Sequence, residues 1–180
     1  MDIISHALIG AAIGEVSATR SWRRVGWCAL LAASADFPQA LFLYPYVAYV
    51  HGRADFIPRL TDWDHFRSAH AVASAIWELP HSVFFLALVV VPLVLYTRLP
   101  RAAIAAYASH LFIDIFTHTG EWSVAPLWPL PWRVEGFCDP WRWTPAEWAA
   151  SIGSCAALWL VVGWLAAHYG RRVPVALPPS

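Results

Sequence analysis

Residues 107–120 read Y-A-S-H-L-F-I-D-I-F-T-H-T-G and place His110, Asp114 and His118 four residues apart. The apolar residues around them favour a helix over Ala102–Thr117. On a helix, each four-residue step advances roughly 40° past a full turn, so the three side chains line up along one face. A carboxylate buried between two imidazoles is costly unless another charge compensates it. A divalent cation is the most economical compensation, so the stripe predicts a metal site.

The composition is typical of a membrane protein. Of the 180 residues, 59% are hydrophobic and 13% are charged, whereas soluble domains carry about 25% charged residues. The chain contains 12 Trp, and its mean hydropathy is +0.50. The alternative reading is a soluble all-α protein with a buried core. The formal net charge of zero gives no electrostatic reason to expect a nucleic-acid partner.

Five apolar segments predict an all-α fold, an integral membrane bundle of about five helices with two long outer loops. The segments are 2–18, 25–50, 81–96, 102–117 and 146–169, and the long loops are 51–80 and 119–144. Pro38 is expected to kink or end the second segment near Asp36. Part of the first loop, 66–79, is expected to form an interfacial helix. We expect a single membrane-embedded domain over 1–172, followed by a short proline-rich tail over 173–180.

The basic residues predict the orientation of this bundle. The links 19–24 and 97–101 and the segment 171–172 contain Arg almost without acids, which places them on the cytoplasmic side. Both long loops then lie outside, where the Trp-rich loop fits an aromatic belt. These features predict a multi-pass protein of the inner (cytoplasmic) membrane whose site opens to the outer side. The first segment lacks a basic n-region, so we expect no secretory signal.

The depth at which each polar residue would lie in the membrane predicts further ligands in the outer half of the bundle. Asp36 interrupts the second segment, His81 opens the third, and His6 lies near the outer end of the first. Ionisable groups at membrane depth are usually functional. Each also has an ordinary alternative: a helix-end hydrogen bond for His6, backbone amides freed by the proline for Asp36, and a helix start for His81. The other four histidines are expected in loops or on the surface: His51, His65, His70 and His168. Two of them, His65 and His70, are kept as further candidate ligands.

Several motifs, taken in order, resemble a known family. They are M-D-I-I-S-H-A-L-I-G at 1–10, A-S-A-D-F-P at 33–38, P-H-S at 80–82, S-H-L-F-I-D-I-F-T-H-T-G at 109–120 and W-P-L-P-W-R at 128–133. This set resembles the DUF457-type inner-membrane metal-dependent hydrolases, which are distantly similar to zinc-dependent phospholipase C and the P1-type nucleases. The resemblance covers roughly residues 1–135. The chain departs from the family where P-D-x-D is replaced by A-D-F-P and where only P-H-S remains of H-R-G-x-T-H-S.

Two Asp and three or four His form a ligand set suited to Zn²⁺, Mn²⁺ or Fe²⁺, and the resemblance implies one or two such ions, Zn above all. Asp114 would bridge the two ions, and Asp114, His118 and Arg67 would be the catalytic residues. Arg67 or Arg133 would neutralise a substrate phosphate. The implied metal ligands are His6, Asp36, His81, His110, Asp114 and His118.

We therefore expect a membrane-bound, metal-dependent hydrolase that acts on a phosphoester-containing lipid or another amphiphile through a metal-activated water. Its expected partners are the lipid bilayer and a phospholipid-like substrate. Two other classes fit the same residues. One is a transporter or proton relay built on intramembrane His and Asp, and the other is a non-catalytic metal-binding membrane protein. The sequence leaves the substrate and the oligomeric state open.

Overall fold

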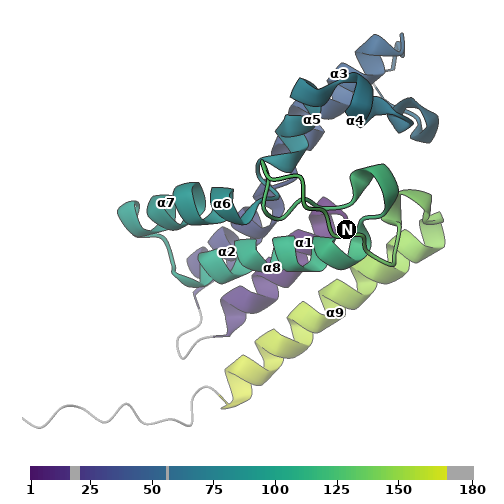
Figure 1. Cartoon of the computed structure of the whole chain (residues 1–180). Coiled ribbons are helices and arrows are strands. Elements are labelled where there is room, and N and C mark those ends of the chain that lie inside the picture. Colours follow the sequence, from purple (N-terminus) through teal and green to yellow (C-terminus); the bar gives the residue numbers. More distant parts are fainter. Residues whose placement is uncertain (17–20, 56, 170–180) are drawn as a thin grey trace, which may run out of the picture.

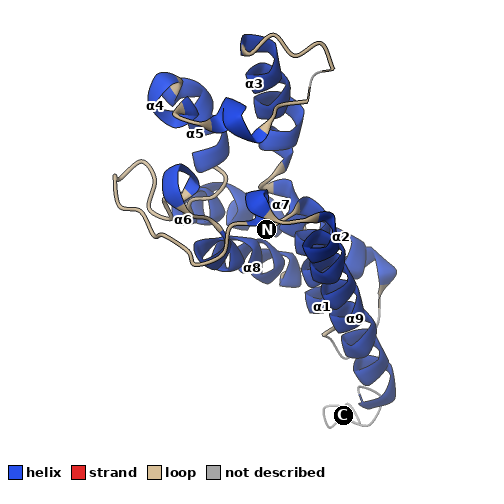
Figure 2. Ribbon diagram, turned by 90° about the vertical axis from the view of Figure 1, so that its right-hand side faces the viewer, coloured by secondary structure: helices blue, strands red, loops and turns tan. Residues whose placement is uncertain are grey.

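The computed structural model describes residues 1–16, 21–55 and 57–169, and within these ranges the regular elements are helical (Figures 1 and 2). The α-helices are α1 Ile3–Glu15, α2 Trp22–Ser34, α3 Tyr44–Val50, α4 Phe66–Ala69, α5 Ala71–Glu78, α6 Val83–Phe85, α7 Val91–Tyr96, α8 Ala102–Thr117 and α9 Pro145–Tyr169. The π-helical segments are η1 Gln39–Leu43 and η3 Leu86–Val90, and the 3₁₀ segments are η2 Leu60–Trp63, η4 Gly120–Trp122 and η5 Pro140–Arg142. The all-α prediction is confirmed. The predicted tail and the arginines at 20, 171 and 172 lie outside the described residues.

Two glycines let α1 and α2 pack backbone to backbone. A Cβ at Gly10 would lie 2.4 Å from the carbonyl oxygen of Cys28, and one at Gly14 would lie 2.7 Å from the Cα of Val25. Small residues four apart on one helix face allow this close approach. The packing brings the first turns of α1, which carry His6, against the helices of the site.

The main core lies between α2, the η3–α7 segment and α8. Its buried residues are Cys28, Leu31, Ala32, Ala35, Val90, Val94, Ala103, Ala106, Tyr107 and Leu111. The buried alanines let α2 and α8 lie close together, while larger side chains fill the space towards α7. Figure 1 shows α8 alongside α1 and α2, with α9 crossing beside α1.

Two helical segments bend where the site residues lie. The 22–34 and 39–50 segments meet at 51°, and the 71–78 and 83–96 segments meet at 56°. The first bend is the break predicted at Pro38, with Asp36 inside it. The second contains His81, which lies in a turn before α6 rather than opening the helix. Ser82 caps α6, because its hydroxyl accepts the backbone N–H of Phe85 at 3.1 Å.

A second group of elements, α3, α4 and α5, rises above the bundle in both views (Figures 1 and 2). It is held by a buried cluster that includes Leu43, Trp63, Phe66 and Trp77. The helix predicted over 66–79 is interrupted at His70, whose φ of −131° ends α4 before α5 begins. The single interfacial helix is therefore two short helices.

Among the described residues, α9 is the one helix long and apolar enough to cross a membrane by itself, with 25 residues. Each bent pair passes the same test if counted as one span, whereas Ile3–Glu15 and Ala102–Thr117 are shorter apolar helices. α9 is mostly exposed, with large apolar side chains such as Leu160 and Trp164 on its surface. A mostly exposed apolar helix of this length favours membrane association.

Candidate metal centre

Four side chains from separate parts of the fold converge on one point. They are Asp36 from the first bend, His81 from the second, and His110 and Asp114 from α8, and one ligand atom of each lies within 4.8 Å of all the others. The Nε2 atoms of His81 and His110 are 3.1 Å apart. Asp114 Oδ2 lies 3.0 Å from His110 Nε2 and 3.4 Å from His81 Nε2. Asp36 Oδ1 completes the group, 3.5 Å from His81 Nε2.

The Nδ1 atoms of both histidines face backbone carbonyls. His110 Nδ1 lies 2.7 Å from the oxygen of Ala32, and His81 Nδ1 is in hydrogen-bond contact with the oxygen of Trp77. A carbonyl oxygen can only accept, so Nδ1 carries the proton in both rings and donates it. In a neutral ring Nε2 is then a free lone pair, as a metal ligand requires.

The two acceptor carbonyls are free because the helices end beside them. In a continuing helix the N–H of Asp36 would bond to Ala32, but it donates to Ala33 at 3.2 Å. The N–H of His81 would likewise bond to Trp77, but it donates to Glu78 at 3.1 Å. Each bend in the chain thus supplies the acceptor that orients one imidazole.

The donor set fits a divalent cation. His81, His110 and Asp114 are at most 1% exposed. The Oδ2 atoms of Asp36 and Asp114 are buried and have no hydrogen-bond partner among the described residues. Buried carboxylate oxygens without a donor are costly unless a positive charge faces them. Two imidazoles and two carboxylates are a ligand set that can hold such an ion.

The two remaining predicted ligands, His6 and His118, face the other carboxylate oxygen of Asp114, Oδ1. His6 Nε2 is 3.0 Å from Asp114 Oδ1, and the His6 ring stacks on His110 with centroids 3.7 Å apart. His118 Nδ1 is 3.6 Å from the same oxygen. The amino group of Met1 also contacts it, at 2.9 Å. Neither His6 nor His118 belongs to the four-residue group, so their role as ligands of a second ion stays a prediction.

His118 does not continue the helical stripe. α8 ends at Thr117, and His118 has extended backbone angles, with φ −130° and ψ 128°. Its side chain is nevertheless buried and lies over the indole of Trp77, with ring centroids 5.5 Å apart. The four-residue spacing therefore predicts its position near Asp114 but not its backbone.

Arg67 and Arg133 lie beside the centre rather than in it. Both guanidinium groups face Glu78, Arg67 at 3.3 Å and Arg133 in a closer contact. Arg67 also lies over the indoles of Trp77 and Trp122, each centroid 5.3 Å away. Burial, and secondarily the charge of Arg133, lower the pKa of Arg67 to about 10, which leaves it charged at neutral pH. The proposed catalytic role of Arg67 stays a prediction.

Of the four histidines expected in loops or on the surface, three are exposed and His70 is half-buried. His65 is 89% exposed and faces Glu121 at 3.2 Å. His70 stacks on Phe66. His51 and His168 are exposed. None of the four belongs to the group that can hold an ion.

Sequence reasoning missed Tyr107 and Trp77, which position His81 without being ligands. The Tyr107 hydroxyl donates to the oxygen of Pro80 at 2.6 Å, which ties α8 to the turn before His81. Trp77 provides the carbonyl for His81 Nδ1 and stacks on its ring, with centroids 4.7 Å apart. Tyr107 lies three residues before His110, on the same helix face, which was the available signal.

Comparison with known proteins gives no match to any family model, curated protein or solved structure. The resemblance to the DUF457-type hydrolases therefore stays a prediction.

Proposed function

We propose that the protein is a membrane-bound, metal-dependent hydrolase of a phosphoester-containing amphiphile. The observation that carries this proposal is the convergence of four ligand atoms within 4.8 Å of one another. Two of them are imidazole nitrogens 3.1 Å apart whose protons lie on the far side of each ring. Two facing lone pairs beside two carboxylates repel one another unless a cation lies between them.

A divalent ion bound here supplies two effects: it lowers the pKa of a bound water towards neutrality and polarises a phosphoryl oxygen. Asp36, His81, His110 and Asp114 are the residues that would hold it. His118 and Asp36 line the adjoining pocket, where a substrate can approach. In the proposed reaction the water oxygen attacks phosphorus and the phosphorus–oxygen bond to the leaving group breaks. His118 would take the proton of the attacking water and pass it to the departing oxygen.

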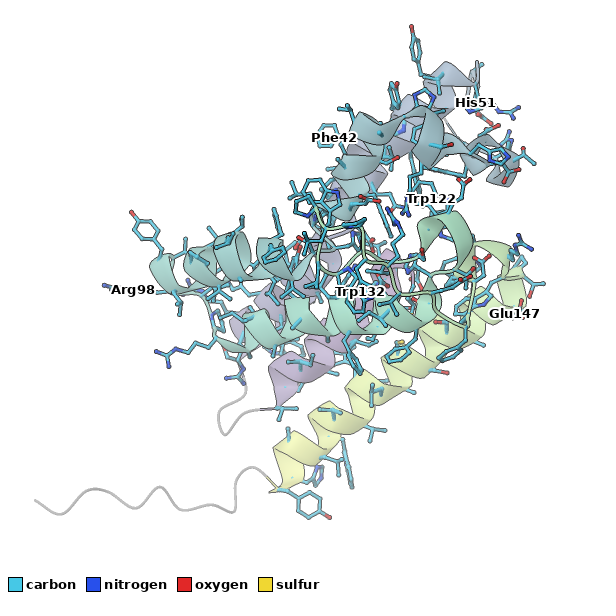
Figure 3. All side chains as sticks on the ribbon, viewed as in Figure 1. Phe42, His51, Arg98, Trp122, Trp132 and Glu147 are labelled. Carbon is cyan, nitrogen blue, oxygen red and sulfur yellow. The ribbon has the colours of Figure 1, made fainter. Side chains whose placement is uncertain are left out.

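We propose a multi-pass arrangement in the cytoplasmic membrane with the site in its outer half. Arg98 and Glu147 lie at opposite ends of the helical part of the molecule (Figure 3). Arg24 lies at the α1–α2 link, where it donates to the oxygen of Gly14 at 2.7 Å, and Arg98 and Arg101 lie at the α7–α8 link. The positive-inside rule assigns both Arg-containing links to the cytoplasm. The α9 end with Glu147 and the Trp-rich loop then face outward.

A proton relay is the second candidate, because the same short contacts link five titratable groups. His6, Asp114 and His110 are joined by contacts of 3.0 Å, and His81 and Asp36 follow at 3.1 and 3.5 Å. Protons on the Nε2 atoms would then replace the metal ion. This series of contacts ends at the backbone carbonyls bonded by His110 and His81 and does not extend along the bundle. A relay needs a path that extends, so the arrangement favours an enclosed metal centre.

Metal titration separates the two candidates. Protein purified in nanodiscs and stripped with a chelator is titrated with Zn²⁺, Mn²⁺ and Fe²⁺, and bound metal and melting temperature are measured. A metal at 100 times its Kd stabilises the folded state by about 2.7 kcal/mol, which corresponds to a rise of about 5–10 °C for a chain of this size. The His110→Ala and Asp114→Asn variants should lose the rise, and the matched variant His168→Ala, at an exposed position of α9, should keep it.

A second measurement tests turnover. Phospholipids, isoprenoid phosphates and nucleotides are screened for metal-dependent release of product. Stoichiometric metal with no product from any of them would favour a non-catalytic metal-binding protein. Failure of metal-replete protein to retain any ion, with no rise in melting temperature on addition of metal, would refute the metal centre.

A further inference from the structure

A pocket adjoins the metal centre and reaches it through Asp36, His118 and Met1, whose amino group lies 2.9 Å from Asp114 Oδ1. Its volume is about 180 Å³, and Asp36 and His118 form part of its wall. Asp36 Oδ1 faces His81 at 3.5 Å, whereas Asp36 Oδ2 is buried and accepts no hydrogen bond from the part of the chain that the structure describes. His118 connects the same wall to Asp114 Oδ1 at 3.6 Å. A phosphoryl group at this end would therefore touch the centre.

The rest of the pocket is mainly apolar. Tyr44, Trp141 and Trp148 contribute aromatic walls, and Ile3 adds an aliphatic one. The Tyr44 hydroxyl is already used, because it accepts a hydrogen bond from the Gln39 amide at 3.0 Å. The Tyr44 ring is also fixed by Trp141, with centroids 6.0 Å apart. These walls offer packing surface rather than free polar groups.

The size of the pocket limits what it can hold. An apolar cavity of about 150 Å³ binds a molecule of the size of benzene, so a pocket of about 180 Å³ accommodates a group of roughly six carbons. Two acyl chains diverging from one glycerol would not fit side by side in such a space.

We propose, building on the hydrolase function above, that this pocket takes the first six or so carbons of a single apolar chain whose phosphoryl group lies at the metal centre. The substrate class is then a single-chain alkyl or isoprenoid phosphoester rather than a diacyl phospholipid. The polar wall and the apolar walls match the two halves of such a molecule. The pocket lies between η1, η5 and the first turns of α9, at the end of the bundle that carries Trp148. A chain can enter there from the membrane surface.

The test uses alkylphosphonates of two, four, six and eight carbons, which carry a phosphoryl group on a bond that the proposed reaction cannot break. Their binding to zinc-loaded protein in nanodiscs is measured by calorimetry, and the His110→Ala variant reports non-specific partition into the bilayer. Burial of each methylene contributes about 0.8 kcal/mol, so affinity should rise about fourfold per carbon. The rise should stop near six carbons, where the pocket is full.

A matched pair of variants locates the effect. Ala40 lines the pocket, and its neighbour Leu41 is 65% exposed and does not line it. Ala40→Phe should reduce the affinity for the six-carbon ligand to that for the two-carbon ligand, whereas Leu41→Phe should retain the chain-length dependence. Phe42, also on η1 and labelled in Figure 3, is exposed and does not line the pocket.

The outcomes distinguish this inference from the proposed function. If zinc and the two-carbon ligand bind but affinity does not depend on chain length, or if Ala40→Phe leaves that dependence unchanged, the pocket inference is wrong and the hydrolase proposal stands. If the protein retains none of Zn²⁺, Mn²⁺ and Fe²⁺, both are wrong.

Discussion

Replacing Gly10 by alanine tests whether the backbone contact between α1 and α2 builds the site. The new Cβ would lie 2.4 Å from the Cys28 carbonyl oxygen and 2.5 Å from the Cβ of Ala32. Ordinary contact begins at 3.4 Å, so the helices must separate by about 1 Å. Overpacking of this kind costs about 1–3 kcal/mol, and helical Gly→Ala returns about 0.5–1 kcal/mol. We expect a net loss of about 0–2.5 kcal/mol in the free energy of unfolding.

Gly153→Ala on α9 is the control, because a Cβ there meets nothing within 4 Å. Both variants make the same chemical change in a helix, so the gain in helix propensity cancels and their difference isolates the packing cost of about 1–3 kcal/mol. Reversible unfolding in mixed micelles measures it. Because α1 carries His6 and α2 carries the carbonyl that orients His110, Gly10→Ala should also weaken zinc binding. Equal stability of the two variants would refute the close packing of α1 and α2.

Three further predictions concern hydrogen bonds. Tyr107→Phe leaves the buried Pro80 carbonyl without its donor and should cost about 1–3 kcal/mol in unfolding experiments, whereas Tyr96→Phe, at a residue 89% exposed, should cost nothing measurable. Hydrogen bonds from Arg53 hold the pKa of Asp62 well below its ordinary value. The stability that the ionised Asp62 contributes to the fold is present above about pH 4 and is lost as pH falls towards the pKa of Asp62 in the folded protein. Wild type should therefore melt at a higher temperature than Asp62→Asn at pH 6–8, and the difference should shrink steadily below pH 4. A difference that does not change with pH would contradict the stabilising role of the Asp62 carboxylate. In chelator-treated protein, His110→Ala should still lower the free energy of unfolding by about 1–3 kcal/mol, and unchanged stability would contradict its bond to Ala32.

The core of the candidate site could be predicted because its strongest signals are local. The spacing of His110 and Asp114 places them on one helix face whatever surrounds them. Pro38 predicts a break, and a break inside an apolar segment explains why Asp36 lies beside the histidines.

The remaining details depend on contacts between distant residues, which spacing does not contain. The end of α8 at Thr117 moves His118 off the helix while keeping it near Asp114. The pairing of Arg67 and Arg133 on Glu78 brings together α4, α5 and the segment between η4 and η5. The π-helical segments η1 and η3 follow the two bends and have no composition signal of their own. The number of membrane spans is also not decided by hydropathy, because α1 and α8 are short apolar helices.

The two bends have a consequence for how this chain tolerates change. A carbonyl released from a helix in an apolar environment needs a donor, and here the donors are the imidazoles of His81 and His110. The Nδ1–H of each histidine therefore donates to a backbone carbonyl, and its Nε2 offers a lone pair to a metal ion. A descendant that gave up the metal would still need a donor at both positions, whereas Asp36 would be free to vary. Histidine retained at 81 and 110 beside a lost acid at 36 would thus mark a chain that keeps the fold after its chemistry is gone.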